Sequence, residues 1–278
     1  MIKEYETLYL EIEPPIARMV LNRPEVLNAI SNQMVKDASQ ALDFIDEDEE
    51  TRVIIVKGKG KAFCSGYDLK MPVEEFSATK PLHRDRDWIL WQVRKWLKLW
   101  NIRKPTVAQV HGYCYAGGTT IAGLCDLIVA ADNALFGQPE SRSIGYPPEL
   151  ANWPFTIGLR KTKELLFTGD SITGKEAERI GMINKSIPED KLENYVEDLA
   201  KRIALCSQDM LTYSKHLVNQ VFEIMGFSAM IQSGVNFDVL GHHSIPMDQF
   251  LKAKKEKGTR AALEVRDGPW GGPKKIGK

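Results

Sequence analysis

The ten residues His111-Gly-Tyr-Cys-Tyr-Ala-Gly-Gly-Thr-Thr120 form one of two glycine-bearing stretches that stand out in this chain. They follow an apolar run, Thr106 to Val110, that predicts a buried strand, and they lead into a small-residue segment that predicts a helix. Glycines at such a junction let the backbone turn sharply. The first N–H groups of the helix have no partner within it, so the junction offers free hydrogen-bond donors.

A second stretch, Ala62-Phe-Cys-Ser-Gly-Tyr-Asp-Leu69, also has a glycine and small residues where the chain must turn. It follows the apolar run Arg52 to Lys57, which predicts a buried strand. Each stretch by itself is a weak signal, because tight strand-to-helix turns are common. Two such junctions brought side by side would form an oxyanion hole, a pair of backbone donors aimed at one oxygen.

Strand and helix patterns alternate on both sides of these stretches. Ile16 to Leu21 predicts a strand, Ser31 suits the N-cap of the following helix, and the pattern from about residue 190 to 262 is helical. We therefore expect an α/β (α+β) fold. Its core would occupy residues 1–205, and residues 206–278 would form a helical region that makes subunit contacts and ends in a basic tail.

The composition argues against several classes of protein. The 278 residues include 37 Lys plus Arg and 37 Asp plus Glu, and this zero net charge disfavours binding to nucleic acid or to a membrane surface. We find no 18-residue apolar segment and no signal peptide. The four cysteines show neither a CxxC pair nor the spacing of metal ligands, which indicates a reducing compartment and no metal. We expect a cytoplasmic protein.

Taken in order, the two glycine-bearing stretches resemble signature segments of the crotonase (enoyl-CoA hydratase/isomerase) superfamily. A third match, Asp132-Asn-Ala-Leu-Phe-Gly-Gln-Pro-Glu140, resembles the segment that ends in a catalytic glutamate of that family. Further matches are Leu21 to Ile30, Leu166 to Asp170 and Glu176 to Ile183, so the resemblance runs from about residue 8 to residue 205. It implies a spiral of ββα units assembled as a trimer or a dimer of trimers.

The resemblance also implies a chemistry. The thioester oxygen of an acyl-coenzyme A would accept hydrogen bonds from the backbone N–H groups of Tyr67 and Gly117, and the α-carbon would become enolate-like. Glu140 would be the acid/base, because partial burial beside an acyl pocket raises a carboxyl pKa toward neutrality. Coenzyme A would enter as part of the substrate, with no permanently bound cofactor.

One position departs from the family pattern. Hydratases of the family carry a second glutamate after the glycines, and this chain has Thr120 there. Threonine cannot act as a general base at neutral pH. Our first prediction remains an enoyl-CoA hydratase. The alternative is a Δ3-Δ2 enoyl-CoA isomerase or a CoA-dependent C–C hydrolase that uses one glutamate. Asp68 and Glu149 are candidate substitute acids, although Asp68 also suits a cap for the adjacent turn.

The resemblance extends to the substrate-binding residues. Trp88 and Tyr146 would form walls of the acyl pocket. Residues expected to line the coenzyme A site are Val26, Leu27, Ala62, Cys64, Gly66, Asp68, Leu69 and Lys70.

Two other readings of the sequence are weaker. A non-catalytic RNA-binding or scaffold relative is disfavoured by the zero net charge and by the retention of Glu140. His242 and His243 are adjacent, so on a helix they point about 100° apart and make a poor metal pair. We expect these histidines at the surface or at a subunit interface.

Overall fold

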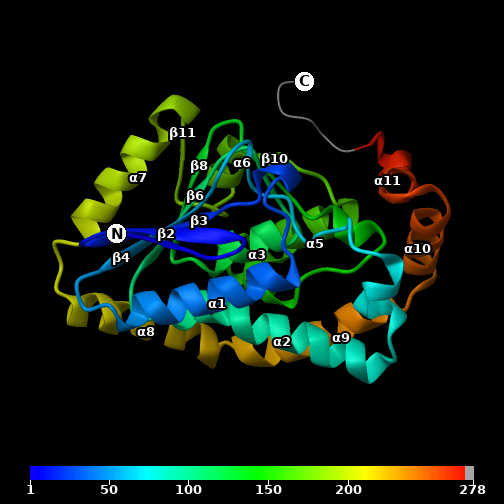
Figure 1. Cartoon of the computed structure of the whole chain (residues 1–278), viewed down its shortest axis with the longest axis horizontal. Coiled ribbons are helices and arrows are strands. Elements are labelled where there is room, and N and C mark those ends of the chain that lie inside the picture. Colours follow the sequence, from blue (N-terminus) through cyan, green and yellow to red (C-terminus); the bar gives the residue numbers. More distant parts are fainter. Residues whose placement is uncertain (273–278) are drawn as a thin grey trace.

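The computed structural model describes residues 1–272 as two β-sheets surrounded by helices (Figure 1). The larger sheet has the order β1-β2-β3-β4-β6-β8-β11, and the smaller has the order β10-β9-β7-β5. The strands of the larger sheet are β1 (Ile2–Glu4), β2 (Leu8–Glu13), β3 (Ile16–Leu21), β4 (Val53–Gly58), β6 (Thr106–Val110), β8 (Leu127–Ala131) and β11 (Lys185–Ile187). The strands of the smaller sheet are β5 (Ala62–Cys64), β7 (Tyr113–Tyr115), β9 (Leu135–Gly137) and β10 (Ile172–Thr173).

The chain winds as a spiral between these sheets. β4, β6 and β8 lie side by side and parallel in the larger sheet, and the strands that follow them, β5, β7 and β9, lie side by side and parallel in the smaller sheet. Every turn of the spiral therefore ends near the same edge as the one before it. This is the predicted ββα arrangement, and it brings the junctions after β5 and β7 together.

Helices cover the sheets and form the lower and right-hand parts of the molecule in Figure 1. They are α1 (Asn32–Glu47), α2 (Leu82–Asn101), α3 (Gly117–Leu124), α4 (Trp153–Thr156), α5 (Gly158–Thr168), α6 (Gly174–Arg179), α7 (Glu189–Ile203), α8 (Gln208–Ile224), α9 (Phe227–His242), α10 (Ile245–Lys257) and α11 (Thr259–Asp267). Short 3-10 segments include Val73–Glu75, Ser77–Thr79, Pro139–Arg142 and Pro148–Asn152.

Local signals in the sequence explain where the elements begin. The Ser31 hydroxyl accepts a hydrogen bond from the Met34 N–H at 3.1 Å, so the predicted N-cap of α1 is confirmed. The apolar runs predicted as strands become β3, β4 and β6, whose side chains are almost entirely buried because both faces of the sheet are covered.

The C-terminal helices pack back onto the core of their own chain. α9 contacts α2 and the segment Pro148–Asn152. On α8, the buried Lys215 donates to the carbonyls of Leu99 and Lys104, both at 3.2 Å, and pairs with Asp126 at 2.8 Å. The predicted division at residue 205 stays a prediction, and the expected basic tail at Lys274 and Lys275 lies outside the described residues.

Candidate active site

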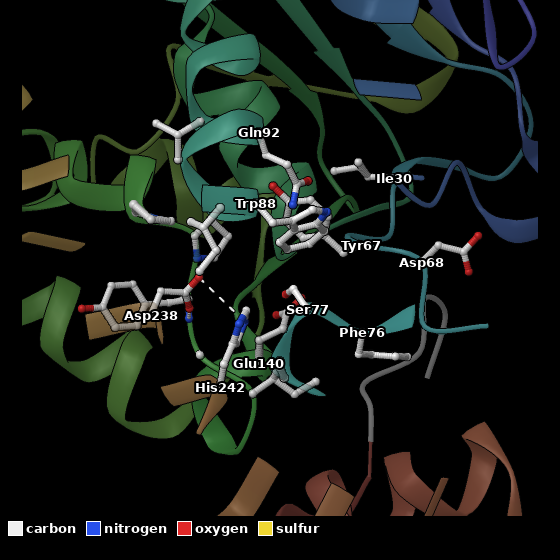
Figure 2. A pocket seen from close by; sticks show the side chains of 18 of the residues that line it. Ile30, Tyr67, Asp68, Phe76, Ser77, Trp88, Gln92, Glu140, Asp238 and His242 are labelled. Atoms are coloured by element: carbon white, nitrogen blue, oxygen red, sulfur yellow. Dashed lines mark hydrogen bonds and ion pairs between the residues drawn. The ribbon is translucent and has the colours of Figure 1, made fainter. Parts of the chain in front are cut away.

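An apolar cavity lies where α2, the segment 67–78, the segment 140–149 and α9 meet (Figure 2). Most of its wall is hydrophobic, and Tyr67, Trp88 and Gln92 lie together on one side of it in Figure 2. Few polar groups reach into the cavity, which is the usual character of a small-molecule site. The residues below are described by their place relative to this cavity.

The two glycine-bearing junctions touch each other at its edge. A Cβ placed on Gly66 would lie 2.5 Å from the Cβ of Ala116, and one placed on Gly117 would lie 2.8 Å from the Tyr67 ring. Side chains at either glycine would force the two turns apart. The fold therefore brings Tyr67 and Gly117 together, although they are far apart in the sequence.

The backbone amides at these two positions are free in the described structure. Ile30 bonds to the residues on either side of Tyr67, through its own N–H to the Gly66 carbonyl at 2.8 Å and through its carbonyl to the Asp68 N–H at 2.9 Å. In such a parallel bridge the amide of the middle residue points the other way. Gly117 is the first residue of α3, so its N–H has no partner within the helix.

Glu140 stands beside this pair of turns. Its Oε1 lies 3.1 Å from the position of a Cβ on Gly66, and its buried Oε2 makes no hydrogen bond within residues 1–272. Burial raises the pKa of Glu140 to about 7, against the opposing effect of the Arg266 guanidinium. A carboxyl group in this state can both take and give a proton near neutral pH.

Thr120 is buried in α3, and its hydroxyl oxygen has no hydrogen-bond partner in the described structure. It does not line the cavity. Glu149 does line it, from the segment Pro148–Asn152, and is only 2% exposed. Burial raises the pKa of Glu149 to about 7, and the nearby Asp238 charge adds to the shift.

Of the two locations expected for the histidines, the surface is wrong for His242, and a subunit interface stays a prediction. Its Nδ1 lies 3.0 Å from a carboxylate oxygen of Asp85, which is fully buried, and its Nε2 lies 3.8 Å from Asp238. Asp238 and His242 both line the cavity, and Figure 2 shows them side by side. The Asp238-to-His242 spacing of four residues on a helix was the available signal, but the partner Asp85 is remote in the sequence.

Several residues predicted to bind substrate line the cavity: Tyr67, Asp68, Leu69, Trp88 and Tyr146. The Asp68 carboxylate accepts the Lys70 N–H at 2.9 Å, as a turn cap would, and pairs with Arg23 at 2.9 Å. In Figure 2 its carboxylate points away from the other labelled side chains. Asp68 is therefore engaged elsewhere and is a poor substitute acid.

The remaining predicted contacts lie outside this cavity. Ala62 and Cys64 are fully buried in β5, and burial raises the pKa of the Cys64 thiol to about 12, so their side chains offer no surface to a ligand. The carbonyls of Val26 and Leu27 accept hydrogen bonds from Ser65, at 3.4 Å and 3.0 Å. Val26 and Leu27 are half-buried, Gly66 is buried, and Lys70 is exposed.

Residues 1–272 contain no group of three or more His, Cys, Asp or Glu side chains arranged to hold a metal ion. Over the same residues, none of the helices has the length and apolar character needed to span a bilayer.

Comparison with known proteins agrees with the geometry. The profile of the enoyl-CoA hydratase/isomerase family matches residues 11–273. A protein of Dictyostelium discoideum named "Probable enoyl-CoA hydratase, mitochondrial" is 32% identical, over 96% of this chain and 92% of its own length. A hydroxycinnamoyl-CoA hydratase-lyase of Pseudomonas fluorescens is 30% identical, over 91% and 95%.

Solved structures give the same result. The crystal structure of an enoyl-CoA hydratase from Mycobacterium smegmatis superposes with a TM-score of 0.90 and 32% identity, covering 96% of this chain and 95% of that one. The fold and the cavity define an enzyme with a crotonase-type spiral. The chain belongs to the enoyl-CoA hydratase/isomerase family.

Proposed function

We propose that this enzyme is an enoyl-CoA hydratase, which adds water reversibly to a 2-enoyl-coenzyme A through a thioester enolate. The observation that carries the proposal is Glu140, a carboxyl group with one buried, unpartnered oxygen, beside two free backbone amides at the edge of an apolar cavity. The names of the relatives point the same way.

The proposed chemistry follows from this arrangement. The N–H groups of Tyr67 and Gly117 donate to the thioester oxygen, and each such donor stabilises the developing oxyanion by about 3–4 kcal/mol. The C=C bond of the substrate is then polarised, so that water can add at the β-carbon. Glu140 transfers the proton at the α-carbon, a role worth roughly 100- to 10,000-fold in rate.

A second candidate within the family is a Δ3-Δ2 enoyl-CoA isomerase or a CoA-dependent C–C hydrolase. The observation that favours it is Thr120, which leaves α3 without a carboxylate. The aromatic wall of Trp88 and Tyr67, whose rings lie 6.4 Å apart, suits a planar or aromatic acyl group. A non-catalytic scaffold is the least favoured hypothesis, because it would not explain the buried, unpartnered oxygen of Glu140.

The experiment is a screen of wild-type enzyme, Glu140→Gln and the surface control Glu50→Gln against short, branched, aromatic and cyclic enoyl-CoAs, with products identified by mass. We expect hydration of at least one substrate by the wild type and the control, and a loss of at least about 100-fold in Glu140→Gln. Equal turnover by Glu140→Gln would refute the assigned role. A shifted double bond without added water would select the isomerase.

We further propose a homotrimer or a dimer of trimers in the cytoplasm, with coenzyme A entering only as part of the substrate. The assembly is supported by large apolar side chains exposed on α8 and α9, among them Leu217, Val221 and Phe237. The location is supported by the free cysteines.

A further inference from the structure

Glu149 is a second buried acid in the acyl cavity that the mechanism above does not use. Neither of its carboxylate oxygens makes a hydrogen bond within residues 1–272, and both are buried. A buried carboxyl group left without partners costs roughly 1–3 kcal/mol or more, so a group in this state calls for an explanation. A substrate or a water molecule in the cavity would supply the missing partner.

Asp238, a second buried carboxyl group in the wall of the cavity, has the partners that Glu149 lacks among the described residues. Its carboxylate accepts the Tyr146 N–H at 2.9 Å and faces His242 across 3.8 Å. Asp238 therefore has internal partners, and Glu149 has none in the described structure. The two acids are buried alike, so burial alone does not account for the difference.

The backbone that carries Glu149 is fixed against the rest of the site. The Asn152 amide donates to the Gly123 carbonyl at 2.9 Å, which ties the segment Pro148–Asn152 to α3, the helix of Gly117. Tyr67 and Glu149 both line the acyl cavity, and after burial the Glu149 charge is the largest influence that raises the pKa of the Tyr67 hydroxyl. Glu149 thus reaches the cavity beside one of the two proposed oxyanion-binding turns.

We propose that Glu149 is the second catalytic carboxylate, in place of the glutamate that α3 lacks at Thr120. As the oxygen of water bonds to the β-carbon, the Glu149 carboxylate takes the water proton. The π electrons move toward the thioester, giving an enolate whose negative charge rests on the oxygen between the two amides. Protonated Glu140 then gives its proton to the α-carbon, and solvent returns the proton from Glu149 to Glu140. This inference rests on the proposed hydratase function.

The step requires one ionised and one protonated carboxyl group at the same time. Burial raises both pKa values to about 7, and the Asp238 charge acts on both groups. Near neutral pH a substantial fraction of the molecules therefore holds a single proton between the two glutamates. That is the state which water addition needs.

The test separates proton transfer at the α-carbon from water addition. Exchange of the α-hydrogens of butanoyl-CoA in D2O, followed by mass, needs only the oxyanion site and Glu140. Hydration of but-2-enoyl-CoA needs both glutamates. Wild-type enzyme, Glu149→Gln, Glu149→Asp, Glu140→Gln and the surface control Glu50→Gln are compared in both assays.

We expect Glu140→Gln to lose both reactions and Glu149→Gln to lose hydration at least about 100-fold more than exchange. Glu149→Asp, which keeps a carboxyl group, should retain more hydration than Glu149→Gln. Equal losses of the two reactions in Glu149→Gln, or hydration within about threefold of wild type, would overturn the inference. A wild type that exchanges but never hydrates would also overturn it, whereas a wild type without exchange would overturn the proposed function itself.

Discussion

Replacing Glu149 by glutamine should change how the stability of the fold depends on pH. The pKa of this carboxyl group is raised from an ordinary value of 4.5 to about 7 by burial. As the pH rises, the unfolded chain therefore releases this proton first. The contribution of the group to stability is fully present below about pH 4.5 and is lost as the pH rises through about 7. Glutamine does not titrate, so the variant escapes this loss.

The size of the effect follows from the two pKa values. Each unit of difference between the folded-state and unfolded-state pKa is worth about 1.4 kcal/mol. The interval from pH 5 to pH 8 covers most, but not all, of the pH range in which the two states differ in bound protons. Over that interval wild type should lose about 2.5 kcal/mol of unfolding free energy through Glu149 alone. Any cost of the glutamine to packing is nearly the same at both pH values, so it cancels in the comparison.

The assay is urea unfolding of wild type, Glu149→Gln and Glu50→Gln at both pH values and one protein concentration, since assembly makes stability concentration-dependent. The difference between Glu149→Gln and wild type should shift by about 2.5 kcal/mol in favour of the variant at pH 8. Glu50 is exposed, and its variant should follow wild type. A pH-independent difference for Glu149→Gln would show that this carboxyl group titrates normally and would refute the reasoning.

Three further predictions concern other parts of the chain. Gly117→Ala should lower kcat about 100-fold or more, because the added Cβ would meet the Tyr67 ring at 2.8 Å and displace the turn; steady-state kinetics checks it. Asp85→Ala should destabilise the fold by about 3 kcal/mol, because it leaves the buried side of His242 without its carboxylate partner. Urea unfolding would measure this loss. Iodoacetamide should modify Cys206 alone in the native enzyme, since the other three thiols are buried, and the mass increase reports the number of groups added.

The sequence predicted the long elements well, because their signals are local. Ile16 to Leu21 and Thr106 to Val110 match β3 and β6 residue for residue, because a largely apolar run is typical of a strand covered on both faces. The strands β5, β7 and β9 have three residues each, which is too short to show a strand pattern in the sequence. Pairing between distant segments defines them, so they were not predicted.

For the candidate site too, residues in local sequence segments were predicted, and residues that depend on long-range contacts were not. Glu140, Tyr67 and Gly117 were predicted as site residues because each lies in a segment that resembles a signature segment of the family. His242 was misplaced at the surface, because its partner Asp85 is 157 residues away and only the fold brings α2 and α9 together. Glu149 was one candidate acid among two, and it was the missing hydrogen-bond partners in the folded chain that separated it from Asp68.

The C-terminal helices are part of the proposed chemistry as well as of the packing. A Cβ on Gly234 of α9 would lie 3.2 Å from Pro148, so α9 presses directly on the segment that presents Glu149. The same helix supplies Asp238, whose charge acts on both Glu140 and Glu149. The predicted boundary at residue 205 would therefore divide the acyl cavity, which is lined by residues from both sides of it. In the proposed mechanism the second acid lies on the segment after Glu140 instead of on α3, so this segment must be held in place. Packing against α9 and the Asn152 hydrogen bond to α3 both hold it.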